Sequence, residues 1–131
     1  MSNEVQTAIV RGIIEWIEED LTATMNIDAV AARSGYSKWH LQRVFKDVTG
    51  IALGEYVRKR RMTDIAINLS RNQDVMVRYF VERYGYSCSP SFYRTFFRLF
   101  GVTPRDARAG EVIPVEAMQH KLVIGDSINV I

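Results

Sequence analysis

The sequence is poor in the residues that build disulfides, metal centres and membrane spans. It contains one cysteine, Cys88, and two histidines, His40 and His120, so an internal disulfide is impossible and no cluster stands at metal-ligand spacing. No apolar run reaches the length of about eighteen residues that a membrane helix needs, and the N-terminus is acidic. These absences predict a cytoplasmic chain with no signal peptide, no membrane contact, no metal and no cofactor.

The charge that is present is distributed unevenly. The 131 residues are 47% hydrophobic and 24% charged, which predicts one globular domain or two small ones that share a helix. The net charge is only +2, but residues 33–61 hold eight Lys or Arg and two acidic residues, whereas residues 1–32 hold one Arg and six acidic residues. Such a basic segment is typical of nucleic-acid binding, although basic segments also occur as plain solvated surface.

Residues 35–50, GYSKWHLQRVFKDVTG, carry two interleaved sets of side chains spaced at i, i+3, i+4 and i+7. Ser37 is a good N-cap for a helix that begins at the next residue. The apolar set fits the core-facing side of a helix and contains Leu41, Val44, Phe45 and Val48. The second set faces outward and contains Trp39, Gln42, Arg43 and Lys46.

The outward set has the chemistry that reads bases. Arg and Gln make bidentate hydrogen bonds to guanine and adenine edges in the major groove, and Trp offers flat apolar contact with thymine methyl groups. Lys46 lies one turn further on and suits a phosphate. From the pattern alone, an ordinary solvated amphipathic helix remains the alternative. For Trp39 by itself the alternative is a core aromatic, and His40 is expected to be exposed or near a phosphate.

The flanking segments complete a helix-turn-helix. Residues 5–21 show a helical apolar stripe and are interpreted as a scaffold helix. Asn26 is expected to cap a short helix over 27–33, in which the small Ala31 permits close helix packing, and Gly35 supplies the turn. After Gly50 the pattern predicts one long helix over 53–69. Its basic side chains, expected to be either solvated or phosphate-facing, are Arg58, Lys59, Arg60 and Arg61.

The motif occurs twice. Residues 85–101, GYSCSPSFYRTFFRLFG, echo the first segment at an offset of 51 residues, which brings Arg94 to the place of Arg43 and Phe96 to that of Phe45. Two reading helices in one chain predict a target with two adjacent major-groove segments, about 34 Å apart. Phe97 is expected to complete the core of the second unit, and a core position is also the alternative for Tyr93.

We therefore predict an all-α fold. Two helix-turn-helix subdomains, residues 1–52 and 71–108, are joined by a connecting helix at 53–70 and followed by a tail at 109–131. The tail contains two short pieces, HKLVIGD and SINVI, with strand-like patterns. Three alternatives stay open for it: it is disordered, it docks on the helical body, or it pairs with another chain.

The motifs SGYSKWHLQRVFK, LGEYVRKRRMT and VERYGY, with the FxxxFG and T-P pattern at residues 96–104, resemble the AraC/XylS family of bacterial transcription activators. The match is most specific to its short MarA/SoxS/Rob-like branch and covers roughly residues 5–108. The resemblance implies a monomer that binds an asymmetric promoter element of double-stranded DNA and helps to recruit RNA polymerase. It implies a bacterial, cytoplasmic regulator, nucleoid-associated when bound, and not an enzyme.

Site residues follow from the resemblance by position. The base-contacting residues would be Trp39, Gln42, Arg43 and Arg94. Further candidates for base or phosphate contact are Ser89, Ser91 and Tyr93. Candidates for phosphate contact are Ser37, Lys38, Lys46, Arg58, Arg60 and Arg98.

The second unit departs from the branch's pattern. Ser89 and Pro90 stand where the branch usually has a Gln-Gln pair, and Pro90 has no side-chain donor. Val81 replaces a usual small Ala, and Ala107 a usual Tyr. These departures favour the hypothesis that the second unit binds mainly phosphates and leaves specificity to the first.

Two other classes of function are weighed against this one. The first is a protein-interaction or effector-binding module that keeps the fold, for which the strand-like tail is the only support. The second is an enzyme that uses Cys88 as an alkyl acceptor, but the sequence offers no base beside that thiol. DNA binding is favoured over both.

Overall fold

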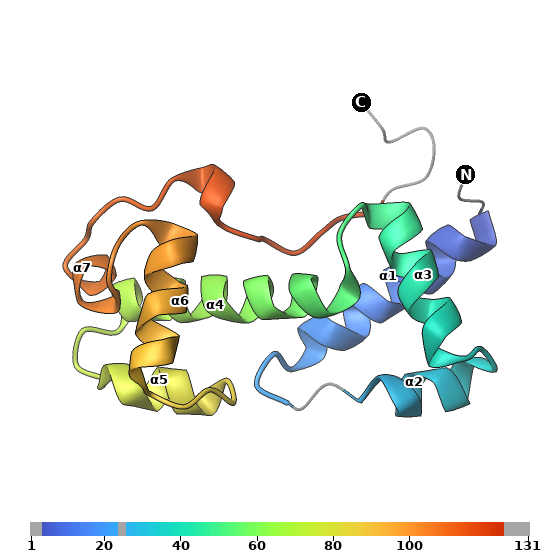
Figure 1. Cartoon of the computed structure of the whole chain (residues 1–131), viewed down its shortest axis with the longest axis horizontal. Helices are drawn as coiled ribbons and strands as arrows, with labels where there is room; N and C mark the ends of the chain where they lie inside the picture. Colours follow the sequence, from blue (N-terminus) through green and yellow to red (C-terminus); the bar gives the residue numbers. More distant parts are fainter. Residues whose placement is uncertain (1–3, 24–25, 125–131) are drawn as a thin grey trace. The chain divides into compact units, whose positions relative to one another are not determined.

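The computed structural model describes residues 4–23 and 26–124 (Figure 1). These residues form seven α-helices, one short 3-10 helix and no strand, so the predicted all-α class is confirmed. The elements are α1 (Glu4–Glu19), α2 (Ile27–Ser34), α3 (Lys38–Thr49), α4 (Leu53–Arg71), α5 (Val77–Arg83), α6 (Pro90–Phe100), α7 (Pro104–Arg108) and η1 (Val115–Ala117).

The chain divides into two compact units. Of the described residues, unit 1 contains 4–20, 26–57 and 121–124, and unit 2 contains 21–23 and 58–120. The long helix predicted over 53–69 is α4, which runs two residues further, to Arg71. The first turn of α4, up to Val57, belongs to unit 1 and the rest of the helix to unit 2.

Unit 1 is a three-helix arrangement in which α1 and α2 both pack against α3. Asn26 and Ser37 cap α2 and α3 as predicted, and Gly35 makes the turn between them with a φ of 81°. This left-handed conformation favours glycine, because other residues meet steric strain there. The buried apolar side chains of unit 1, including those from the first turn of α4, are Val10, Ile13, Ile14, Ile17, Ala31, Leu41, Val44, Phe45, Leu53, Tyr56 and Val57.

Unit 2 repeats the motif with α5 and α6. One face of α4 packs against both helices and α7, and Figure 1 shows α6 crossing α4. Val81 is fully buried four residues before Gly85, so this core takes the larger side chain where Ala31 stands in unit 1. The core residues are Met62, Ile65, Ala66, Leu69, Phe80, Val81, Tyr84, Phe92, Phe96, Phe100 and Ala107.

The tail docks on the helical body as far as residue 124. Ile113, Ala117 and Met118 pack against the core of unit 2, and the Gln119 amide donates to Thr63 Oγ1 at 2.9 Å. In unit 1, the Leu122 amide donates to Tyr56 Oη at 3.0 Å. Residues 120–124 form neither helix nor strand, and the piece SINVI lies outside the described residues.

Candidate nucleic-acid interface

The helix α3 is fixed at both ends and anchored along one side. Ser37 Oγ accepts a hydrogen bond from the His40 amide at 3.1 Å, and Gly50 ends the helix with a φ of 81°. Leu41, Val44 and Phe45 are at most 1% exposed. Because these three side chains share one face of a 3.6-residue helix, the opposite face is held toward solvent.

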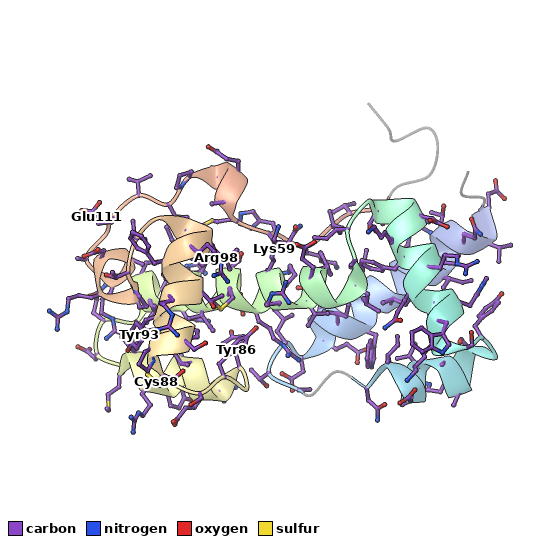
Figure 2. The ribbon with its side chains drawn as sticks, viewed as in Figure 1. Lys59, Tyr86, Cys88, Tyr93, Arg98 and Glu111 are labelled. Carbon is purple, nitrogen blue, oxygen red and sulfur yellow. The ribbon has the colours of Figure 1, made fainter. Side chains whose placement is uncertain are left out.

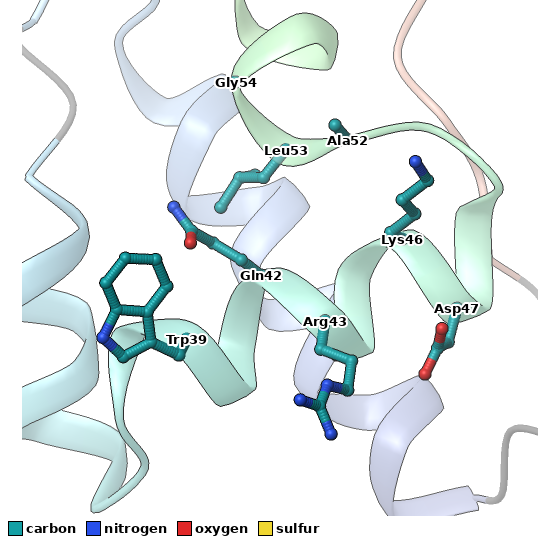
Figure 3. A pocket seen from close by; sticks show the side chains of 8 residues that line it. All are labelled: Trp39, Gln42, Arg43, Lys46, Asp47, Ala52, Leu53 and Gly54. Atoms are coloured by element: carbon teal, nitrogen blue, oxygen red, sulfur yellow. The ribbon is translucent and has the colours of Figure 1, made fainter.

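That outward face carries the predicted base-reading side chains. Trp39 is 71% exposed, so it is not a core aromatic, and the Lys38 ammonium lies 5.2 Å from the centroid of its ring. Arg43 and Lys46 are exposed, and Gln42 is half-buried. Figure 3 shows these side chains around a depression of about 470 Å³, lined by Trp39, Gln42, Arg43, Lys46, Asp47, Ala52, Leu53 and Gly54.

The arrangement combines donors, one flat apolar surface and positive charge within two turns of helix. Gln42 and Arg43 supply paired donors of the geometry that purine edges accept. Lys38 also lies 3.9 Å from a carboxylate oxygen of Asp28, an exposed ion pair that is weak in water and therefore open to exchange for a phosphate.

The helix α6 is built in the same way but presents different chemistry. Ser89 Oγ accepts from the Phe92 amide at 3.4 Å and caps the helix, and Pro90 occupies the first turn, where its missing N–H costs nothing. Phe92, Phe96 and Phe100 are buried. The exposed side chains opposite them are Ser91, Tyr93, Arg94, Phe97 and Arg98.

Two aromatic side chains on this face of α6, Phe97 and Tyr93, have surroundings that the sequence did not predict. Phe97 is 54% exposed, so the prediction that it completes the core is wrong: the three buried phenylalanines already fill that face. Figure 2 shows Cys88 beside Tyr93, whose Oη lies 3.4 Å from Cys88 Sγ. This hydrogen bond, with partial burial, raises the pKa of Tyr93, so its phenol stays protonated and neutral.

Of the basic residues of α4, some are exposed to solvent and others donate hydrogen bonds to backbone carbonyls of the protein. Arg58 is exposed, as a phosphate contact requires. Arg60 is only 6% exposed and donates from Nη1 to the Gln119 carbonyl at 3.0 Å. The position expected to face phosphate is therefore covered by the tail. Arg61 Nε donates to the Leu21 carbonyl at 2.9 Å.

The described residues contain neither a metal-binding cluster nor a membrane-spanning helix. No group of three or more His, Cys, Asp or Glu side chains within them is placed to hold a metal ion. None of the helices described is both long enough and apolar enough to cross a membrane.

A helix-turn-helix that holds a basic helix outward, present twice in one chain, defines a DNA-binding protein. A family model described as a helix-turn-helix domain matches residues 20–110. The chain is 43% identical over 99 residues to the multiple antibiotic resistance protein MarA of Escherichia coli, covering 76% of this chain and 77% of that one. It is 43% identical over 100 residues to the regulatory protein SoxS of Salmonella typhimurium, covering 76% and 92%.

Among solved structures, the C-terminal domain of AraT, a response regulator from Geobacillus stearothermophilus, superposes with a TM-score of 0.69 at 26% identity, covering 86% of this chain and 93% of that one. The chain belongs to the AraC/XylS family, in its MarA/SoxS-like branch. It is a bacterial helix-turn-helix regulator of transcription, from a family of DNA-binding proteins that are not enzymes.

Proposed function

We propose that the protein activates transcription by binding an asymmetric promoter element as a monomer, with α3 and α6 in two adjacent major-groove segments, and by helping to recruit RNA polymerase. It acts in the bacterial cytoplasm, on the nucleoid. The observation that carries the proposal is the outward face of α3. Trp39, Arg43 and Lys46 are exposed there, directly opposite side chains that are fully buried.

Each side chain of this face has a role. Gln42 and Arg43 discriminate purine edges, and each good bidentate contact contributes about 1–3 kcal/mol of discrimination. Trp39 contacts thymine methyl groups and sugars. Lys38, Lys46 and Arg58 neutralise phosphates, which fixes the register of the helix and adds affinity that falls with salt.

The second helix supplies the other half of the contact. Arg94 stands at the place of Arg43, 51 residues later, and is exposed on α6. Ser91 and Arg98 flank it on the same face, where they suit phosphate contact. Ser37 and Ser89 already accept a backbone hydrogen bond as helix caps, and their hydroxyl protons remain able to donate to a phosphate oxygen.

The test is selection of bound sequences from a random duplex library, with the intact chain, with Arg43→Ala and with Arg71→Ala. We expect the intact chain to enrich a bipartite site of about two helical turns. Arg43→Ala should relax specificity at one or two base pairs of one half only. Arg71 is exposed in the last turn of α4, so removing it serves as the matched loss of one positive charge and should leave the selected site unchanged.

Transcription in vitro from the selected site then separates activation from binding. Purified bacterial RNA polymerase should initiate more often when the protein is present, and the increase should disappear with a scrambled first half-site. Failure of the folded protein to enrich any sequence would refute the proposal and favour a protein-interaction module that has kept the fold.

A further inference from the structure

The outward face of α6 is aromatic where that of α3 is polar. Tyr93 and Phe97 are 40% and 54% exposed, and they lie one helical turn apart, so their rings are neighbours on one face. The repeat offset of 51 residues places them at the positions of Gln42 and Lys46. An exposed pair of large aromatic rings calls for an explanation, because apolar residues of this size are usually buried.

The helix core does not explain these rings. Phe92, Phe96 and Phe100 point inward and are between 0% and 5% exposed. Phe97 follows Phe96 by one residue and is therefore turned by about 100° away from that stripe. Its exposed surface is available to a partner.

The same face has few hydrogen-bond donors near its start. Pro90 has none, and the Ser89 hydroxyl, whose oxygen accepts from the backbone, offers a single donor. The Tyr93 hydroxyl already lies 3.4 Å from Cys88 Sγ. Hydrogen-bonded reading of bases therefore falls to Arg94, and the surface that Tyr93 and Phe97 present toward a groove is apolar.

The flanking charges indicate that the partner is DNA. Arg94 and Arg98 are exposed next to the two rings, and an apolar strip bordered by guanidinium groups suits a polyanion that also carries apolar groups. In the major groove the apolar group on a base edge is the C5 methyl of thymine. On the proposed function, α6 occupies that groove.

We propose that Phe97, with the ring of Tyr93 beside it, contacts thymine C5 methyl groups in the second half-site, and that this contact makes α6 a base-specific reader. The proposal rests on the proposed function. It replaces the expectation that the second unit binds mainly phosphates, because phosphates offer nothing to a phenylalanine ring.

The test replaces each thymine of the selected site, one at a time, with deoxyuridine, which removes only the C5 methyl group. Affinities are measured by fluorescence anisotropy for the intact chain, Phe97→Ala, Phe97→Leu and Val112→Ala. We expect the intact chain to lose affinity about fourfold at one or two thymines of the second half-site, the loss expected for one buried methyl group. Phe97→Ala should bind more weakly overall and should show no further loss at those thymines.

The two control variants sharpen this result. Phe97→Leu keeps an apolar side chain and should retain part of the sensitivity to deoxyuridine. Val112 is 84% exposed in the tail, outside the proposed interface, so its alanine variant should behave as the intact chain does. Since Phe97 is exposed, Phe97→Ala should fold normally, which circular dichroism checks.

The outcomes separate this inference from the proposed function. If the library yields no enriched site, the proposed function fails and the inference fails with it. If a bipartite site is enriched but its second half has no preferred thymine, or no methyl removal there matters, the inference is overturned and the proposed function stands. Equal sensitivity to deoxyuridine in the intact chain and Phe97→Ala would also overturn it.

Discussion

Replacing Arg60 with alanine should lower the stability of the protein while leaving the salt dependence of DNA binding unchanged. Arg60 is 6% exposed as a residue, and its guanidinium donates to the Gln119 carbonyl at 3.0 Å. A hydrogen bond from a charged group contributes about 1.5–3 kcal/mol, and truncation also removes the packing of the aliphatic part of the side chain. We expect the free energy of unfolding to fall by about 2–3 kcal/mol.

The assay pairs urea denaturation with DNA titrations at several salt concentrations, and Arg58→Ala is the matched control. Arg58 is exposed on the same helix, so its loss should change stability by no more than about 0.5 kcal/mol. It should reduce the slope of log affinity against log salt by about 0.9, the value for one phosphate contact. If Arg60→Ala reduced the slope by that amount and left stability intact, Arg60 would be a phosphate contact and the reasoning from its burial would be refuted.

Two further predictions concern unit 2. Arg108 donates to two carbonyls of the turn after α4, so Arg108→Ala should lower the free energy of unfolding by about 2 kcal/mol. Arg105 is exposed on the same helix, and Arg105→Ala should change the free energy of unfolding by less than about 0.5 kcal/mol. Equal effects of the two substitutions in urea denaturation would contradict this prediction. Burial, and then a hydrogen bond to Asp64, raise the pKa of Tyr84 above its usual 10.0. The folded state therefore holds the phenol proton more tightly, and stability is full below about pH 10 and falls above it. Tyr84→Phe should show a smaller alkaline fall in its urea midpoint, and an unchanged fall would argue against this assignment.

Local patterns in the sequence were sufficient to predict the helices that form the first reading unit. The N-cap residues Asn26 and Ser37 stand directly before apolar positions at helical spacing, and both cap their helices. The outward position of Trp39 follows from its spacing relative to Leu41 and Phe45. Such features depend on contacts within one or two turns of chain, which is why residue order alone determines them.

Contacts between distant segments were not predictable in the same way. Arg60 is covered by Gln119, 59 residues further along the chain, and no local pattern reports such a contact. One signal was present: Arg60 shares a helical face with Tyr56 and Thr63, at i, i+4 and i+7, and both of these side chains are also buried. A helix distributes the four consecutive basic residues 58–61 around its whole circumference, so they do not form one patch.

The exposure of Phe97 could have been predicted from the repeat. Residue type favours burial for phenylalanine, but the offset of 51 residues aligns Phe97 with Lys46, which lies on an outward face. The same register aligns Tyr93 with Gln42. Repeated units share backbone geometry, so the position in the repeat is a better guide to exposure here than the hydrophobicity of the side chain.

This register also gives a physical reason for an asymmetric target. The two helices hold their outward faces with similar buried stripes and similar caps, but α3 offers an amide and an ammonium where α6 offers two aromatic rings. Donors select purine edges and phosphates, whereas rings select methyl groups. On the proposals made above, one half of the site is defined by its hydrogen-bonding edges and the other by its thymines. A monomer with two unlike readers then has a single favoured orientation on the promoter, which is what a fixed contact with polymerase requires.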